Sequence, residues 1–249
     1  MTATLSDIFR HPIKAHSFEA LTTTRVIEGR TLPWDRHWAV VHEHAKTDGT
    51  AWAPCPNFSR GAKAGSLMAI SATLDENSGR LALSHPDLGR LDFDPATEEG
   101  RFLDWVRPIM PEDRAASRGI VSVPDRGMTD TDFPSISLAG RASLDALSEE
   151  LGQSLDPRRF RANLWIDGLA PWEEFDWIGK TIRIGEVTFH VQERITRCRA
   201  TMANPETGQV DADTLGALET GWDHTDFGVY LVAQSSGTLA LGDKLEVLA

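Results

Sequence analysis

The sequence predicts a mainly β protein with a few helices, an α+β chain in which short strands outnumber helices. Short apolar stretches recur along its 249 residues, and many of them end at glycine or proline turns. Two turns, Gly185-Glu186 and Gly242-Asp243, are flanked by alternating apolar residues, which is the pattern of a two-residue β-hairpin. Many short strands, glycine turns and few helices favour a β-barrel or another closed β-rich fold.

The first half of the chain is expected to be strands followed by one helix. The predicted strands are residues 8–13, 38–42, 67–74, 81–83 and 91–93, with a turn at 77–80. Asp94-Pro95 is a good helix start, because Asp suits the N-cap and Pro suits the first helical position. Phe102, Trp105, Val106 and Ile109 then follow at helical spacing, and Pro108 and Pro111 should end the helix.

In the second half, two helices and several strands are predicted. Ser143 is the expected N-cap of a helix that ends at Gly152, and a short helix is expected over 213–220. The predicted strands are 120–123, 163–166, 182–184, 187–191, 229–233, 239–241 and 245–247. Residues 110–118 are rich in charge and proline, and we interpret them as a link between domains. The predicted division is a β-rich domain over 1–115 and a β-barrel domain over 116–249.

The overall charge limits the classes of partner. A formal net charge of −12 argues against a general nucleic-acid or anionic-membrane binder. The sequence has no run of about 18 apolar residues, which predicts no transmembrane helix. The first residues lack a basic region followed by an apolar core, so no secretory signal is expected. With only two cysteines, far apart in sequence, a reducing cytoplasm is the predicted location.

Cys198 is the first candidate functional residue. It is one of the two cysteines and lies among Arg194, Arg197 and Arg199. Nearby cations favour the thiolate, which is the reactive and metal-binding form of cysteine. The alternative is an inert core thiol, since free cysteine is among the most buried residue types. The other cysteine, Cys55, lies between two prolines, which is more typical of a structural or incidental loop thiol.

The second half resembles the MOSC domain, which molybdenum-cofactor sulfurases share with the mitochondrial amidoxime-reducing component. The resemblance is carried by short motifs in the family's order: Phe160-Arg161-Ala162-Asn163, Ile166-Asp167-Gly168, Pro171-Trp172-Glu173-Glu174 with Trp177-Ile178-Gly179-Lys180, Ile184-Gly185, Thr196-Arg197-Cys198, Asn204-Pro205-Glu206-Thr207-Gly208, and Phe227-Gly228-Val229-Tyr230 with Leu241-Gly242-Asp243. Each motif is weak alone, but their order over about 90 residues is specific.

The first half is similar to the β-barrel-type domain that precedes MOSC in the amidoxime-reducing branch. Pro12-Ile13-Lys14 matches its Pro-Val-Lys element, and Trp34-Asp35-Arg36 with Trp38 matches its Asp-Arg-x-Trp element. Phe58-Ser59-Arg60 lies at its Thr-x-Arg element. Two departures matter: Ala15 replaces a common serine, and Phe58 replaces the threonine. Both changes remove a polar side chain that the family uses near the cofactor.

The resemblance implies a bound molybdenum cofactor, a pyranopterin with a dithiolene and a terminal phosphate. Cys198 matches the family cysteine that ligates molybdenum in the reductase branch, and a soft thiolate suits that metal. The implied cofactor-binding residues are Lys14, Arg36, Arg60, Thr131, Asp132, Arg161 and Asn163. Arginine and lysine supply the charged donors that a phosphate needs.

The resemblance also implies a function, with alternatives. The first is an oxidoreductase that reduces N-hydroxylated small molecules, with Cys198 as catalytic residue and metal ligand. The sequence lacks the cysteines of an iron–sulfur cluster, so a separate ferredoxin- or flavin-type donor protein would supply electrons. The second is a cofactor carrier or sulfur-transfer module without reductase activity. The third is a degenerate relative that binds no cofactor, and Ala15 and Phe58 are its best support.

Overall fold

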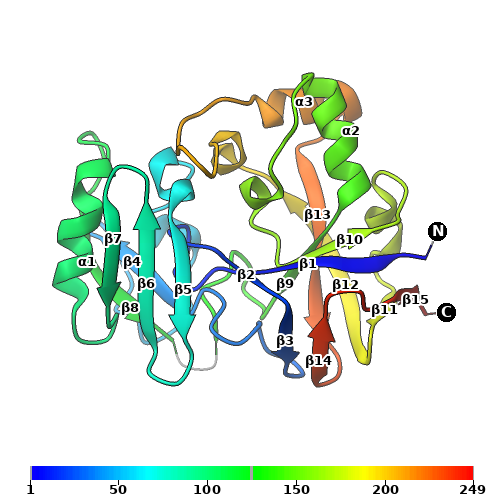
Figure 1. Cartoon of the computed structure of the whole chain (residues 1–249), viewed down its shortest axis with the longest axis horizontal. Helices are drawn as coiled ribbons and strands as arrows, with labels where there is room; N and C mark the ends of the chain where they lie inside the picture. Colours follow the sequence, from blue (N-terminus) through cyan, green and yellow to red (C-terminus); the bar gives the residue numbers. More distant parts are fainter. Residues whose placement is uncertain (1, 124–125, 249) are drawn as a thin grey trace.

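The computed structural model describes residues 2–123 and 126–248, and its largest element is an eight-stranded sheet (Figure 1). Its strands are Thr4–Arg10 (β1), Glu19–Leu21 (β2), Ile136–Gly140 (β9), Leu164–Asp167 (β10), Thr181–Ile184 (β11), Val187–Thr196 (β12), Asp226–Ala233 (β13) and Leu245–Val247 (β15). They lie in the order β15-β11-β12-β13-β9-β10-β1-β2. Neighbours are antiparallel except β9 and β10, which are parallel.

This sheet curves until its two sides meet, but it does not form the predicted closed barrel. The backbone N–H of Leu5 donates to Asp243 O at 2.8 Å, and that of Leu245 donates to Ala3 O at 2.9 Å. One isolated bridge, Thr4 to Lys244, accompanies these bonds. Because one bridge is not a ladder between two strands, the sheet stays open at this point. The predicted mainly β class with a few helices is confirmed.

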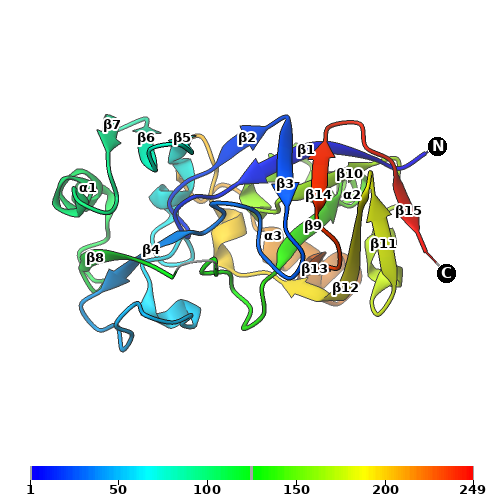
Figure 2. The ribbon, with the colours of Figure 1, turned by 90° about the horizontal axis from the view of Figure 1, so that it is seen from below.

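Smaller sheets complete the fold, and two of them lie on the left in Figures 1 and 2. One pairs Trp38–His42 (β4) with Ser117–Ser122 (β8); the other joins Ser71–Asp75 (β5), Arg80–His85 (β6) and Gly89–Phe93 (β7). Helix α1 (Glu99–Val106) packs against β7 and β8, with Phe102 stacked on Phe93 at a centroid distance of 5.4 Å. The third pairs Thr23–Val26 (β3) with Gly237–Ala240 (β14).

Alternating burial explains why β11 and β12 form the predicted hairpin. Val187, Phe189 and Val191 are buried, and the residues between them are less so, as one buried sheet face requires. Gly185 has a φ of 57°, which suits the first position of a Gly-X turn. These side chains belong to the core of the large sheet, whereas Phe93 and Phe102 belong to a separate core beside α1.

The helices differ from the prediction at their starts. The first begins at Glu99 rather than after Asp94, because residues 94–98 form a turn in which Asp94 Oδ1 accepts from the N–H of Ala96 at 2.9 Å. Helix α2 (Arg141–Leu151) begins two residues before Ser143, whose hydroxyl instead binds the Glu174 carboxylate. Its predicted end is confirmed, with Gly152 at a φ of 65°. Helix α3 (Thr214–Trp222) packs on α2.

Two strand predictions are wrong in part. Residues 67–69 lie in a 3-10 turn, η2 (Gly65–Ala69), and only 71–75 form a strand. The turn at Gly242-Asp243 does not join a hairpin: β14 pairs with β3, and β15 pairs with β11. The two strands therefore take partners distant in sequence rather than each other.

Strand pairing crosses the predicted domain boundary in both directions. Strands β1 and β2 lie in the large sheet with strands of the second half, whereas β8, just past residue 115, pairs with β4. The division at residue 115 stays a prediction. Among the residues that the structure describes, no helix has the length and apolar character to cross a membrane.

Candidate functional site

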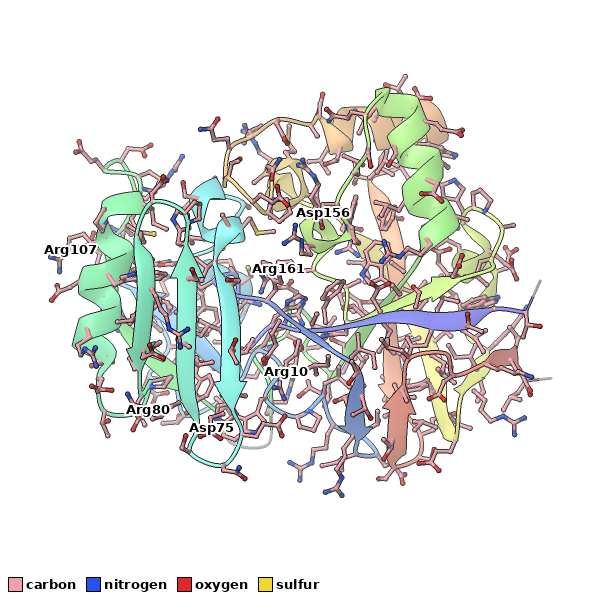
Figure 3. The ribbon with its side chains drawn as sticks, viewed as in Figure 1. Arg10, Asp75, Arg80, Arg107, Asp156 and Arg161 are labelled. Carbon is pink, nitrogen blue, oxygen red and sulfur yellow. The ribbon has the colours of Figure 1, made fainter. Side chains whose placement is uncertain are left out.

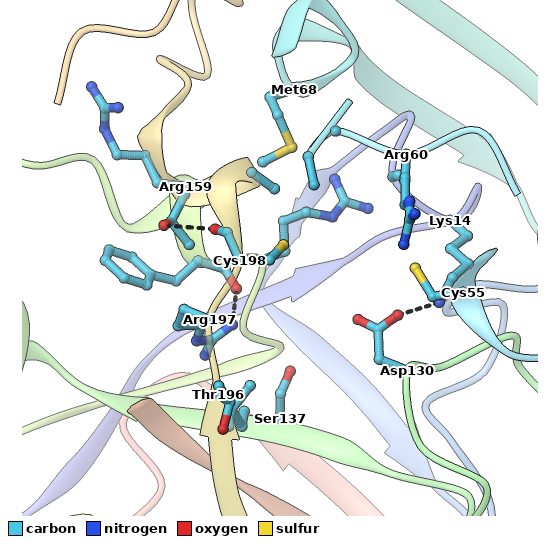
Figure 4. Close-up of a pocket in the computed structure, with 18 of the residues that line it drawn as sticks. Lys14, Cys55, Arg60, Met68, Asp130, Ser137, Arg159, Thr196, Arg197 and Cys198 are labelled. Atoms are coloured by element: carbon cyan, nitrogen blue, oxygen red, sulfur yellow. Dashed lines mark hydrogen bonds and ion pairs between the residues drawn. The ribbon is translucent and has the colours of Figure 1, made fainter. Parts of the chain in front are cut away.

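A cavity of about 270 Å³ brings together residues from both halves of the chain. Five predicted site residues line it: Lys14, Arg36, Arg60, Arg161 and Cys198. Figure 4 shows Cys198 on one side and Arg60, Lys14 and Cys55 on the other, with the two sulfur atoms directed into the cavity. The predicted convergence of a thiol with basic side chains from distant segments is therefore present. Their roles toward a cofactor remain predictions.

Strand β12 positions Cys198. The strand ends at Thr196, whose hydroxyl donates to Asp226 Oδ1 on β13 at 2.7 Å. Cys198 then precedes a 3-10 turn, η6 (Arg199–Met202), and its carbonyl accepts from the Thr201 hydroxyl at 3.2 Å. The residue is exposed, so it does not act as a core thiol. A side chain held at a strand end and open to a cavity can reach a ligand.

The three neighbouring arginines point to different surroundings. Arg197 is held under the cavity by two carbonyls: Nη1 donates to Phe160 O at 2.7 Å, and Nε donates to Phe227 O at 2.8 Å. Burial lowers the pKa of Arg197 to about 10. Arg194 lies over the Phe175 ring instead, at 4.2 Å from its centroid, and Arg199 is exposed. Of these three cations, Arg197 lines the cavity.

Lys14 is paired with Asp130, a cavity residue that sequence reasoning missed. The Lys14 ammonium donates to the Asp130 carboxylate and to Met128 O, the latter at 2.8 Å. Burial alone would raise the pKa of Asp130, but Lys14, Arg36 and Arg161 outweigh it and hold that pKa at about 2. The prediction found the correct loop but chose Thr131 and Asp132, one and two positions further along.

Arg36 connects two segments of the cavity wall through hydrogen bonds. Its guanidinium donates to the buried Asp35 carboxylate and, through Nη2, to the Arg161 carbonyl at 2.9 Å. Burial would lower the pKa of Arg36, but Asp35 and Asp130 raise it overall. The Arg36–Asp35 pair is a buried ion pair and not a weak surface pair, because Asp35 is 1% exposed. Most Arg36 donors are thus committed to the protein.

Arg161 differs, because one of its donors has no partner. The residue sits at a φ of 50° after η4 (Pro157–Phe160), and its Nη2 atom is buried without a hydrogen bond among the described residues. Burial and the neighbouring Arg36 charge lower the pKa of Arg161 to about 9. A buried cationic donor without a partner is costly, and an anionic ligand in the cavity would relieve that cost. Figure 3 shows Arg161 between the three-stranded sheet and the large sheet.

The remaining predicted residues lie outside this cavity. Asn163 is buried beside it, where its Oδ1 accepts from the backbone N–H of Ser137 at 3.1 Å and its Nδ2 donates to Phe9 O at 3.1 Å. Asn163 thereby ties β9, β10 and β1 together. The Thr131 hydroxyl donates to Phe133 O at 2.7 Å, and Asp132 is exposed. Cofactor contact by these three residues stays a prediction.

Cys55 and Tyr230 are further cavity residues. Cys55 begins a 3-10 turn, η1 (Cys55–Asn57), and lines the cavity; burial raises the pKa of the Cys55 thiol. It therefore lies in the site, although sequence reasoning placed it in an incidental loop. Tyr230 is the sole tyrosine of the chain, and burial raises its pKa as well, so it stays protonated. The convergence of both cysteines in one cavity left no local sequence signal.

His42 and His44, two residues apart, could share a strand face and bind a metal, but the structure does not support a metal site there. His42 Nε2 lies 2.8 Å from Pro56 O, and its Nδ1 accepts from the His44 N–H at 3.2 Å. Both ring nitrogens of His42 are thus engaged by backbone groups. Within residues 2–123 and 126–248, no group of three or more His, Cys, Asp or Glu side chains has a metal-binding arrangement.

Comparison with known proteins finds a family model that matches the second half of the chain. Residues 126–246 match the model of the MOSC domain, which confirms the predicted MOSC resemblance for that part of the chain. The chain is 36% identical to a molybdenum cofactor sulfurase of Drosophila grimshawi over 121 residues, which cover 45% of this chain and 15% of that protein. It is 34% identical to the molybdenum cofactor sulfurase of Drosophila mojavensis over 114 residues, covering 44% and 14%. The match therefore spans about a seventh of these relatives.

Solved structures give more distant likenesses. The YUAD protein from Bacillus subtilis superposes with a TM-score of 0.49 at 11% identity, over 99% of this chain and 96% of that one. YiiM from Geobacillus stearothermophilus gives a TM-score of 0.34 at 17% identity, over 46% and 54%.

Proposed function

We propose that this chain, whose residues 126–246 match the MOSC domain, binds a molybdenum cofactor in the cavity and reduces N-hydroxylated small molecules. The observation that carries the proposal is that Cys198 faces the same cavity as Lys14, Arg36, Arg60 and Arg161, which come from both halves of the chain. A soft sulfur donor beside a cluster of cations matches a ligand that has both a soft metal and a phosphate.

The donor set fits such a cofactor. Cys198 would ligate the metal, and Arg161 would donate to the phosphate, because it has a buried donor without a partner. Arg60 has no carboxylate partner among the described residues and is a second candidate for the anion. Arg36 would act mainly by holding Arg161 in place. When bound, the cofactor supplies the two-electron redox chemistry, and the protein supplies orientation and charge.

The two departures from the family pattern have different consequences in the fold. Ala15 lines the cavity at a φ of 64° and offers no side-chain donor there. Phe58 is 1% exposed and packs in a core with Val41 and Met128, so its side chain is turned away from the cavity. The lost contact at position 15 is thus the one that bears on ligand binding.

The partners follow from the proposed chemistry. A small-molecule substrate would enter the cavity, and a separate ferredoxin- or flavin-type protein would supply the electrons. We place the reaction in the cytoplasm, where both cysteines would stay reduced.

Reduction of benzamidoxime tests this function. Protein produced in a host that makes the cofactor would be assayed for molybdenum content and for benzamidine formation with an artificial electron donor. We expect turnover by the loaded protein and none by Cys198→Ser, with unchanged thermal unfolding of the variant. Full turnover by Cys198→Ser with bound molybdenum would reject Cys198 as the metal ligand.

A second function is favoured by the names of the similar proteins, which are molybdenum cofactor sulfurases. In this case the chain would carry the cofactor or transfer sulfur, and the exposed Cys198 would hold a persulfide. Mass spectrometry after incubation with a cysteine desulfurase and cysteine would show 32 Da added at Cys198. Such a product, together with inactive cofactor-loaded protein, would favour transfer over reduction.

A further inference from the structure

Met68 lies at the edge of the cavity on the side of Cys198 (Figure 4). It belongs to η2, is 2% exposed at the molecular surface, and contributes to the cavity lining. Small residues lie beside it in the same lining: Gly61, Ala62 and Ala200. A long, flexible thioether among small neighbours fills irregular space and adapts to what it contacts.

Met68 leaves no room for a side chain at Gly61. A Cβ added at Gly61 would lie 2.7 Å from Met68 Sδ and 3.4 Å from Ala200 Cβ, so these three residues meet at one point. Ala200 lies two residues after Cys198, in the turn η6. Met68 therefore lies near the turn that follows the thiol, and both residues line the same cavity.

Further along, η2 and the segment after Cys198 approach each other closely at two more glycines. A Cβ at Gly65 would lie 2.9 Å from Gly208 O, and a Cβ at Gly208 would lie 2.4 Å from Ser66 Cα. Because backbone meets backbone here, the two segments cannot come closer together. At Gly61, by contrast, the nearest atoms belong to the flexible Met68 side chain.

The cavity lining mixes apolar and charged side chains. Met68, Phe160, Ile195 and Ala200 contribute apolar surface to it. Arg159 and Arg197 lie on the side of Cys198, and Lys14 and Arg60 lie on the opposite side (Figure 4). A group that reaches Met68 would gain contact with its thioether.

We propose that Met68 is a specificity-determining residue that admits slender groups to the part of the cavity beside Cys198 and excludes broad ones. For the reductase, the preferred substrates would carry the N–O group on a narrow body; this extension rests on the proposed function. The reactivity of the thiol toward slender and broad reagents does not rest on that function, because it can be measured without a cofactor.

Alkylation of the cofactor-free protein tests this role directly. In a Cys55→Ser background, Cys198 is the sole thiol of the chain. Its alkylation rates with iodoacetamide and with the broad reagent N-(1-pyrenyl)maleimide would be measured by mass spectrometry. We expect Met68→Ala to raise the rate ratio of pyrenylmaleimide to iodoacetamide by at least about tenfold, the lower end of the discrimination that a single methylene gives in a pocket. Met68→Phe should lower that ratio.

Met110→Ala is the matched control, because Met110 is half-buried and lines a different cleft. Thermal unfolding would verify that each variant is folded before its rates are compared. A ratio that stays unchanged in both Met68 variants, or that changes equally in Met110→Ala, would overturn the proposal. Since no cofactor is needed, such a failure is distinct from failure of the benzamidoxime assay. A changed ratio with inactive loaded protein would retain the role of Met68 and reject the reductase.

Discussion

The Arg36 guanidinium donates to the Arg161 backbone carbonyl at 2.9 Å, so one cavity cation fixes the position of the other. The two charges repel each other, and Arg36 contributes to the lowered pKa of Arg161. Asp35 and Asp130 supply the nearby negative charge. The site thus keeps like charges close together before any ligand binds, as electrostatic binding of an anion requires.

Replacing Arg36 should destabilise the fold as well as the site. Arg36→Met would leave the buried Asp35 carboxylate without its guanidinium partner, and breaking a buried pair in this way costs about 3 kcal/mol. Urea unfolding followed by tryptophan fluorescence would give the free energy of unfolding. Arg25→Met is the control, because Arg25 is exposed and forms no ion pair among the described residues; its effect should stay within about 0.5 kcal/mol. Equal losses in both variants would contradict the role assigned to Arg36.

Asp130 should make stability fall in acid. Its pKa is lowered from 3.8 to about 2 in the folded protein, so its stabilising contribution is present above pH 3.8 and is lost as the pH falls toward 2. The difference in free energy of unfolding between the wild type and Asp130→Asn should therefore shrink over that interval. Denaturant unfolding at a series of pH values would measure it. A difference that is constant between pH 5 and about 2 would show that Asp130 has an ordinary pKa.

Glu174 should act in the opposite direction. Burial raises its pKa above 4.5, although the Gly140 N–H and the Ser143 hydroxyl partly counter this. A raised pKa means that its favourable contribution is present below pH 4.5 and is lost as the pH rises through the folded pKa. Glu174→Gln cannot ionise, so the wild type should lose stability relative to it between pH 4.5 and the folded pKa. Parallel stability curves for the two proteins would show that the pKa of Glu174 is the same in the folded and the unfolded protein.

The glycine at position 208 should be irreplaceable. Gly208→Ala combines a φ of 73° with a Cβ placed 2.4 Å from Ser66 Cα, so we expect a loss of about 3 kcal/mol in the free energy of unfolding. Gly242→Ala provides the comparison, because Gly242 has a φ of 89° but no atom within 4 Å of an added Cβ. Its loss should be about 1 kcal/mol, from backbone strain alone. Similar losses at both positions would mean that the close approach at Ser66 relaxes freely.

Local sequence patterns predicted local structure well and strand pairing less well. Gly185-Glu186 and Gly242-Asp243 give the same hairpin signal, yet only the first joins paired strands. The hairpin predicted at Gly242-Asp243 does not form, because β14 and β15 each pair with a strand that is distant in sequence. A local sequence pattern contains no information about these distant partners. The interior of α2 shows the same limit: Ser143 has a good capping side chain, but a carboxylate from Glu174, distant in sequence, engages it instead.

The site residues that lie in short sequence motifs were predicted. The site residues that only the tertiary structure brings together were missed. Cys198, Lys14 and Arg161 lie in recognisable short motifs and do converge. Asp130 was missed by one position, since neighbouring polar residues in one loop are indistinguishable until their directions are known. Cys55 had no motif, and only tertiary structure shows that it shares a cavity with Cys198.

The position of β1 between β10 and β2 has a consequence for the order of folding. Its partners in β10 lie about 160 residues later in the chain, and its bridge to Lys244 lies later still. During synthesis, the edge of β1 that pairs with β10 therefore stays unpaired until most of the polypeptide has been made. Such distant pairings slow folding and leave an exposed strand edge in the nascent chain. Lys14 lies four residues after the end of that strand, so the ligand cavity should be among the last parts of the molecule to form.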